Sequence, residues 1–134
     1  KDLDHGFRAD VMLASTLAGI LISQSGTSLP HGMGYPLTYF KGLPHGLANG
    51  VLMIEYLRSF KDQTKIEKML KVMGMSSLAE LEEILKKLIT VKVKITEEEI
   101  REYAQEFIAN KAKLKNHTEE VKLEDIERIY RNSL

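Results

Sequence analysis

Residues 26–50 read GTSLPHGMGYPLTYFKGLPHGLANG, and the tripeptide Pro-His-Gly occurs twice in this stretch. Its histidines, His31 and His45, are fourteen positions apart. In each tripeptide the proline fixes how the chain enters a helix, and the glycine lets the backbone approach a neighbour closely. Neutral imidazole is the commonest protein ligand for transition metals, but most pairs of histidines in turns are ordinary surface or capping residues. The spacing alone therefore leaves two interpretations open, a metal site and a pair of structural turns.

Helical patterns flank this stretch on both sides. Before it, residues 8–25 are apolar on nearly every face, which predicts a central helix with 11–22 as the most buried helical segment of the domain. The run 11–22 is shorter than the roughly 20 residues that a membrane-spanning helix needs, so no membrane is expected. Within the stretch, 28–42 should form an irregular helix or a loop with helical turns. Pro44 occupies a typical first position of a helix that should continue to about Phe60.

The second half of the chain also shows helical signals. Two capping boxes, Ser77-x-x-Glu80 and Thr96-x-x-Glu99, mark helix starts ahead of apolar residues at helical spacing. Residues 91–95 alternate apolar and lysine residues, which predicts an extended connector rather than a sheet. The helices expected in this half cover 64–73, 78–88, 97–111 and 123–132. Together the patterns predict an all-α, bundle-like domain with six or seven helices and no sheet.

Composition sets further bounds. The chain has 134 residues, of which 43% are hydrophobic and 28% charged, as expected of one ordinary globular domain. The net charge is zero, which argues against a nucleic-acid-binding protein, and the basic run from Lys111 to Lys115 is interpreted as a solvated face. Because cysteine is absent, disulfides and thiolate metal sites are excluded, and a cytoplasmic location is expected.

The segment Pro44-His45-Gly46-Leu-Ala-Asn49-Gly50, preceded by His31 and Gly34, resembles the signature of the iron-containing (group III) alcohol dehydrogenases. The segments 96–100 and 123–130 are similar to the two closing helices of that family's C-terminal domain. The resemblance therefore covers essentially the whole chain. The Pro-His-Gly-Leu-Ala-Asn run is much more specific than a count of histidines.

The resemblance implies an oxidoreductase with an N-terminal domain that binds NAD or NADP. It also implies an all-helical, dehydroquinate synthase-like C-terminal domain that holds a divalent metal, Fe²⁺ first and Zn²⁺ as the alternative, through one aspartate and three histidines. His31 and His45 match the last two of these ligands. The other two, an Asp-x-x-x-His pair, do not precede His31, and no glycine-rich phosphate loop is present. We therefore interpret 1–134 as a single metal-binding domain, truncated at its N-terminus and inactive alone.

The resemblance also implies roles for aromatic residues. Tyr35 occupies a position where many family members have a histidine close to the nicotinamide and the substrate. We expect Tyr35 to contact the cofactor and to line a substrate pocket with Tyr39 and Phe40. A phenol is a poor proton acceptor at neutral pH, so Tyr35 should shape this pocket rather than relay protons.

The function expected from the resemblance is the interconversion of a small alcohol and its aldehyde or ketone. The expected partners are that substrate, the N-terminal nucleotide-binding domain and, as an open alternative, a second copy of the chain in a homodimer. Two other functions stay open from the sequence. One is a sister enzyme of the same superfamily, a glycerol dehydrogenase or a dehydroquinate synthase-like lyase. The other is a non-catalytic helical interaction module whose histidines only cap turns.

Overall fold

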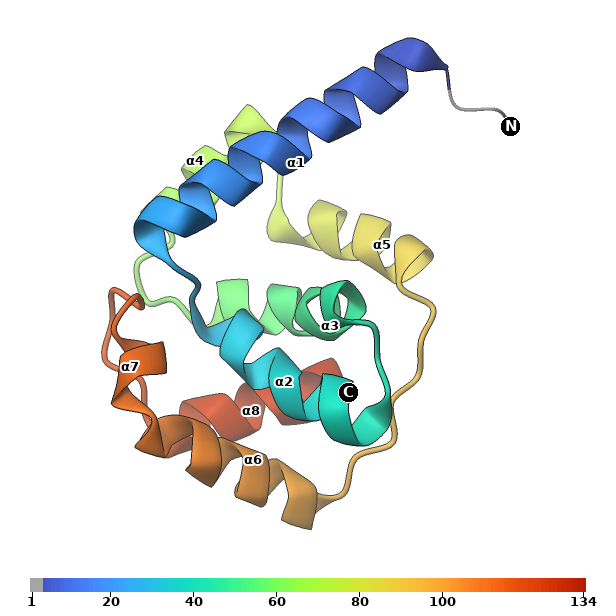
Figure 1. Cartoon of the computed structure of the whole chain (residues 1–134). Coiled ribbons are helices and arrows are strands. Elements are labelled where there is room, and N and C mark those ends of the chain that lie inside the picture. The colour runs from blue at the N-terminus through green and yellow to red at the C-terminus, as the bar shows by residue number, and fades with distance from the viewer. Residues whose placement is uncertain (1–3) are drawn as a thin grey trace.

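The computed structural model describes residues 4–134 (Figure 1). This part of the chain forms helices and no strand, so the all-α prediction is confirmed. The eight helices exceed the six or seven expected because a single turn, α7, follows α6, while 28–42 forms one helix despite its internal Pro36. The helices are α1 (His5–Ser25), α2 (Leu29–Lys41), α3 (His45–Arg58), α4 (Thr64–Val72), α5 (Leu78–Leu88), α6 (Glu97–Ala109), α7 (Lys111–Leu114) and α8 (Leu123–Ser133).

Four of these helices, α2, α3, α6 and α8, build the main core. Each contributes apolar residues at helical spacing, such as Ile126, Ile129 and Tyr130 of α8, which are fully buried. The hydroxyl of Tyr130 donates a hydrogen bond to the carbonyl oxygen of Met33 over 2.6 Å. Burial raises the pKa of Tyr130, so the phenol stays a neutral donor. This bond holds α8 against the turn of α2 that carries His31.

A second, smaller core lies between α3, α4 and α5. At the start of α5, the Ser77 hydroxyl accepts a hydrogen bond from the Glu80 backbone, but the Glu80 carboxylate accepts from Ser76 instead of Ser77. The first capping box is therefore only half formed. The second is complete, because Thr96 and Glu99 each accept from the other's backbone. The connector at 91–95 forms neither helix nor strand.

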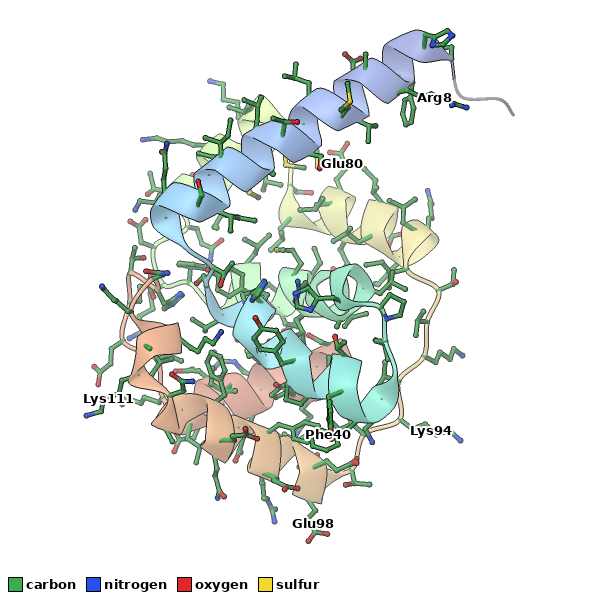
Figure 2. All side chains as sticks on the ribbon, in the orientation of Figure 1. Arg8, Phe40, Glu80, Lys94, Glu98 and Lys111 are labelled. Carbon is green, nitrogen blue, oxygen red and sulfur yellow. The ribbon has the colours of Figure 1, made fainter. Side chains whose placement is uncertain are left out.

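The prediction that 11–22 is the most buried helical segment is wrong. The helix that contains it, α1, has no buried residue and extends away from the packed helices, with Arg8 near its far end (Figures 1 and 2). All-round apolar character indicates that a helix needs a cover, but it does not say which residues supply that cover. No residue of 4–134 buries the apolar faces of α1. Leu13, for example, is 58% exposed.

The helix around 11–22 is also longer than the apolar run from which no membrane was expected. That run has 12 residues, whereas α1 is 21 residues long and, by length and composition, is apolar enough to cross a bilayer. The buried core helix of a larger globular protein satisfies the same criteria. Length and hydropathy therefore do not decide what covers α1.

Candidate metal centre and adjoining cavity

The two Pro-His-Gly tripeptides bring His31 and His45 together at the starts of neighbouring helices. His31 lies in the first turn of α2, and His45 is the first residue of α3, one position later than Pro44 predicts. Between the helices, Gly42 adopts the left-handed conformation (φ 69°), which ends α2 and turns the chain towards α3. The imidazole ring centroids are 4.6 Å apart with the ring planes at 83°. The structure thus brings together the two residues that the sequence singled out.

Tyr35 completes a cluster of three rings. It lies one turn after His31 on α2, and its ring meets the His31 ring edge-on at 5.1 Å. The same ring stacks on His45 at 5.4 Å with an interplanar angle of 19°. Tyr35 is 44% exposed, so one side of the cluster faces solvent. Tyr35 therefore contacts both histidines, while its contact with a cofactor stays a prediction.

Asn49 positions His45 from the next turn of α3. The amide nitrogen of Asn49 lies 3.2 Å from His45 Nε2. Which of the two groups donates depends on the imidazole tautomer and on the orientation of the amide; when His45 binds a metal through its other nitrogen, Nε2 carries the proton and the amide oxygen accepts from it. The amide fits because Gly34 has no side chain, since a Cβ there would lie 2.4 Å from Asn49 Oδ1. Gly34 and Asn49, both part of the quoted pattern, thus support His45 by close packing.

The other histidine has an unmet requirement. His31 Nδ1 is buried and has no hydrogen-bond partner among residues 4–134. Burial lowers the pKa of His31, and electrostatic interactions with His45 and Lys113 lower it further. His31 is therefore neutral at physiological pH, the state in which imidazole binds metals. A buried nitrogen without a partner is unfavourable, so a ligand that satisfies it would stabilise the site.

Residues 4–134 bring two imidazoles together but do not by themselves form a complete metal-binding group. Within residues 4–134, no group of three or more histidine, aspartate or glutamate side chains could hold a metal ion. Near the start of the chain, Asp4 caps α1 by accepting from the Phe7 backbone, His5 is exposed at the start of that helix, and Asp2 lies outside the described residues. The chemistry of the pair fits two of the four ligands implied by the sequence resemblance.

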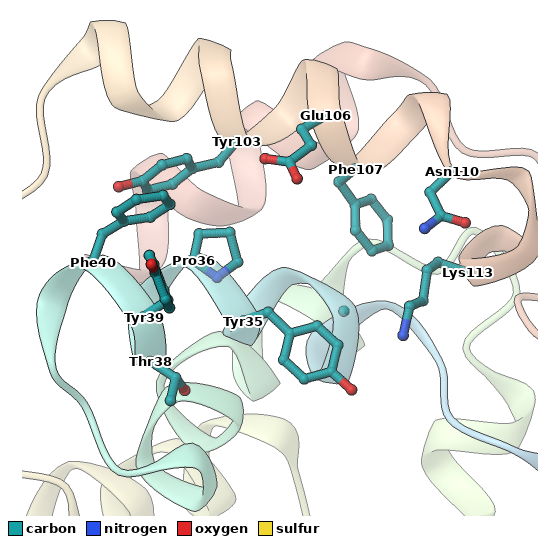
Figure 3. A pocket seen from close by; sticks show the side chains of 11 residues that line it. Tyr35, Pro36, Thr38, Tyr39, Phe40, Tyr103, Glu106, Phe107, Asn110 and Lys113 are labelled. Atoms are coloured by element: carbon teal, nitrogen blue, oxygen red, sulfur yellow. The ribbon is translucent and has the colours of Figure 1, made fainter.

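A cavity of about 680 Å³ lies beside the ring cluster, between α2, α6 and α7 (Figure 3). Tyr35, Tyr39 and Phe40 all line it, and their role in binding a substrate stays a prediction. Phe40 stacks on Tyr103 of α6 with ring centroids 5.7 Å apart. Tyr39 and Phe40 are both exposed, Tyr39 by 83%, so their rings form the solvent-facing wall of the cavity. The histidines themselves do not line the cavity, and Tyr35 is the ring shared by the cavity and the histidine pair.

One residue of this site escaped the sequence analysis. Lys113, interpreted there as part of a solvated face, is half-buried and lines the cavity. Its ammonium nitrogen lies 4.7 Å from the centroid of the Tyr35 ring. The sequence signal for Lys113 is the helix break at Asn110. A new helical turn, α7, begins after this break, so the lysines of 111–115 do not continue the faces of α6.

Comparisons with known proteins agree with this architecture. The family model described as "Fe-containing alcohol dehydrogenase family, C-terminal" matches residues 1–134. An iron-containing alcohol dehydrogenase of known structure superposes with a TM-score of 0.83 and 32% identity over 98% of this chain. The iron-containing alcohol dehydrogenase of Thermotoga maritima gives the same TM-score, with 31% identity and the same coverage. Lactaldehyde reductase of Escherichia coli strain K12 is 37% identical over 75 residues, which are 54% of this chain.

These relatives are much longer than the stretch they share with this chain. The chain covers 36% of the two solved chains and 19% of lactaldehyde reductase. The superpositions include nearly all of the chain, so most of α1 has a structural counterpart in the solved enzymes.

Proposed function

Because this chain belongs to the iron-containing alcohol dehydrogenase family, we propose that it is the C-terminal metal-binding domain of an NAD(P)-dependent dehydrogenase. This enzyme interconverts a small alcohol and its aldehyde or ketone. The observation that carries the proposal is the convergence of His31 and His45, with the buried Nδ1 of His31 left without a partner. The similarity to lactaldehyde reductase supports a short-chain substrate.

In this proposal His31 and His45 hold a divalent cation, Fe²⁺ or Zn²⁺, with two further ligands from outside residues 4–134. A cation bound there would polarise the substrate oxygen as a Lewis acid. Asn49 keeps the His45 ring oriented, and the Tyr35 ring covers one side of the histidine pair. The exposed apolar surface of α1 then packs against the remainder of the enzyme. A helical interaction module has no comparable observation in its favour.

Metal removal tests the proposal. In the enzyme that contains this domain, metal content measured by mass spectrometry should be close to stoichiometric, and chelation should abolish alcohol-dependent reduction of NAD or NADP. Adding Fe²⁺ or Zn²⁺ back should restore the activity, because the histidines that hold the cation are unchanged by chelation. Full turnover after complete metal removal would contradict the proposal.

Replacing Tyr35 separates a wall residue from a proton relay. Tyr35→Phe keeps the ring contacts with both histidines and removes only the hydroxyl, so kcat/KM should fall by no more than about tenfold, or about 0.5–1.5 kcal/mol. Tyr35→His introduces a group that titrates near neutral pH and should change the pH profile of kcat/KM. Both variants are compared with the parent from pH 5 to 10, about the range over which these groups titrate. A thousandfold loss in the Phe variant would make the hydroxyl catalytic.

A further inference from the structure

Lys113 differs from the two lysines beside it in the basic run. Lys111 and Lys115 are exposed, and the Lys111 side chain extends into solvent (Figure 2). Lys113 is half-buried, lines the cavity and places its ammonium group over the Tyr35 ring (Figure 3). The charge of Lys113 also interacts electrostatically with His31. Of the three lysines, this one is therefore directed towards the site.

The charge of Lys113 is not neutralised within residues 4–134. No carboxylate of the described chain forms an ion pair with it, whereas Lys41 pairs with Glu99 at 2.6 Å. Glu106 lines the same cavity but lies on the other side of the Phe107 ring in Figure 3. A partly desolvated ammonium group next to an open cavity attracts an anion from solution. The aromatic contact holds the ammonium group in place while leaving its N–H groups free to donate.

We propose that Lys113 determines substrate specificity by binding an anionic group, a carboxylate, at the end of a short substrate opposite its reacting hydroxyl or aldehyde. The proposal rests on the function proposed above. Its geometry follows from Tyr35, whose single ring contacts both His45 and the Lys113 ammonium group. A short substrate bound along this ring would have its reacting end at the histidine pair and its other end at Lys113. The substrate class is a short hydroxy acid and the corresponding aldehyde acid.

The activity test compares 3-hydroxypropanoate with propane-1,3-diol, which has the same length but no charge. In the enzyme that contains this domain, Lys113→Met should lower the ratio of kcat/KM for the acid to kcat/KM for the diol by about 10- to 100-fold, as expected for a charged hydrogen bond. Lys113→Arg should restore most of the ratio. The matched controls Lys111→Met and Lys115→Met remove the same charge from the same run and should leave the ratio unchanged.

A binding test keeps this inference separate from the proposed function. Calorimetric binding of 3-hydroxypropanoate to the metal-free enzyme should be weakened by Lys113→Met and unaffected by Lys111→Met, whether or not the enzyme turns over. Loss of binding together with absence of any alcohol oxidation would support Lys113 and refute the dehydrogenase. Three results would overturn the Lys113 proposal: no binding of the acid to the parent, equal binding to the parent and Lys113→Met, or a raised KM for NAD(P) with an unchanged acid-to-diol ratio.

Discussion

Replacing His31 or His45 with alanine is expected to remove bound metal and turnover together. Each change deletes one of four expected ligands. The two rings are 4.6 Å apart, and no further histidine, aspartate or glutamate of residues 4–134 completes a metal-binding group with them. The loss of metal affinity should exceed the 10- to 100-fold that is typical when a residue supporting a ligand is lost. Metal content and kcat are measured on the same preparations of the enzyme that contains this domain.

Two further variants grade the expected effect. Asn49→Ala removes the amide that hydrogen-bonds to His45 Nε2 but keeps both imidazoles, so metal affinity should fall by about 10- to 100-fold without being abolished. His5→Ala is the matched control, because His5 is exposed at the start of α1 and far from the pair in sequence. Stoichiometric metal and normal turnover in either His31→Ala or His45→Ala would exclude that histidine as a ligand.

The helical architecture was largely predictable because its signals are local. Gly26, Gly42 and Gly74 have positive φ at helix ends, and Thr96 starts α6 with a complete capping box. These features depend on a few neighbouring residues, which a sequence contains in full. The closeness of His31 and His45 is not local in this sense, and it was inferred from a family resemblance rather than from spacing.

Two of the differences from the sequence predictions concern what lies next to a segment. The apolar faces of α1 require burial, but the sequence of α1 does not contain the surface that buries it. Lys113 belongs to a run that is polar by composition, and only the break after α6 directs its side chain over Tyr35. The composition of a basic run describes its residues together, whereas the direction of one side chain depends on the backbone turn that carries it.

Alanine in place of the glycine that follows each histidine should have opposite effects on stability, although the two tripeptides are identical. At Gly32 an added Cβ would lie 2.4 Å from Cε2 of Phe107, a buried ring of α6 that cannot withdraw without disturbing the core. Such overpacking costs about 1–3 kcal/mol, more than the 0.5–1 kcal/mol or so that alanine contributes through helix propensity. Gly32→Ala should therefore destabilise the domain.

At Gly46 the same substitution meets open space, since no heavy atom lies within 4 Å of the added Cβ. The residue is exposed in the first turn of α3, so only the propensity term remains, and Gly46→Ala should stabilise the domain by up to about 1 kcal/mol. Thermal unfolding followed by circular dichroism should show Tm lowered in the first variant and unchanged or raised in the second. Equal changes of Tm with the same sign in the two variants would mean that Gly32 does not pack against Phe107. Because Phe107 also lines the cavity, the unfolding data test the same contact that shapes the proposed substrate site.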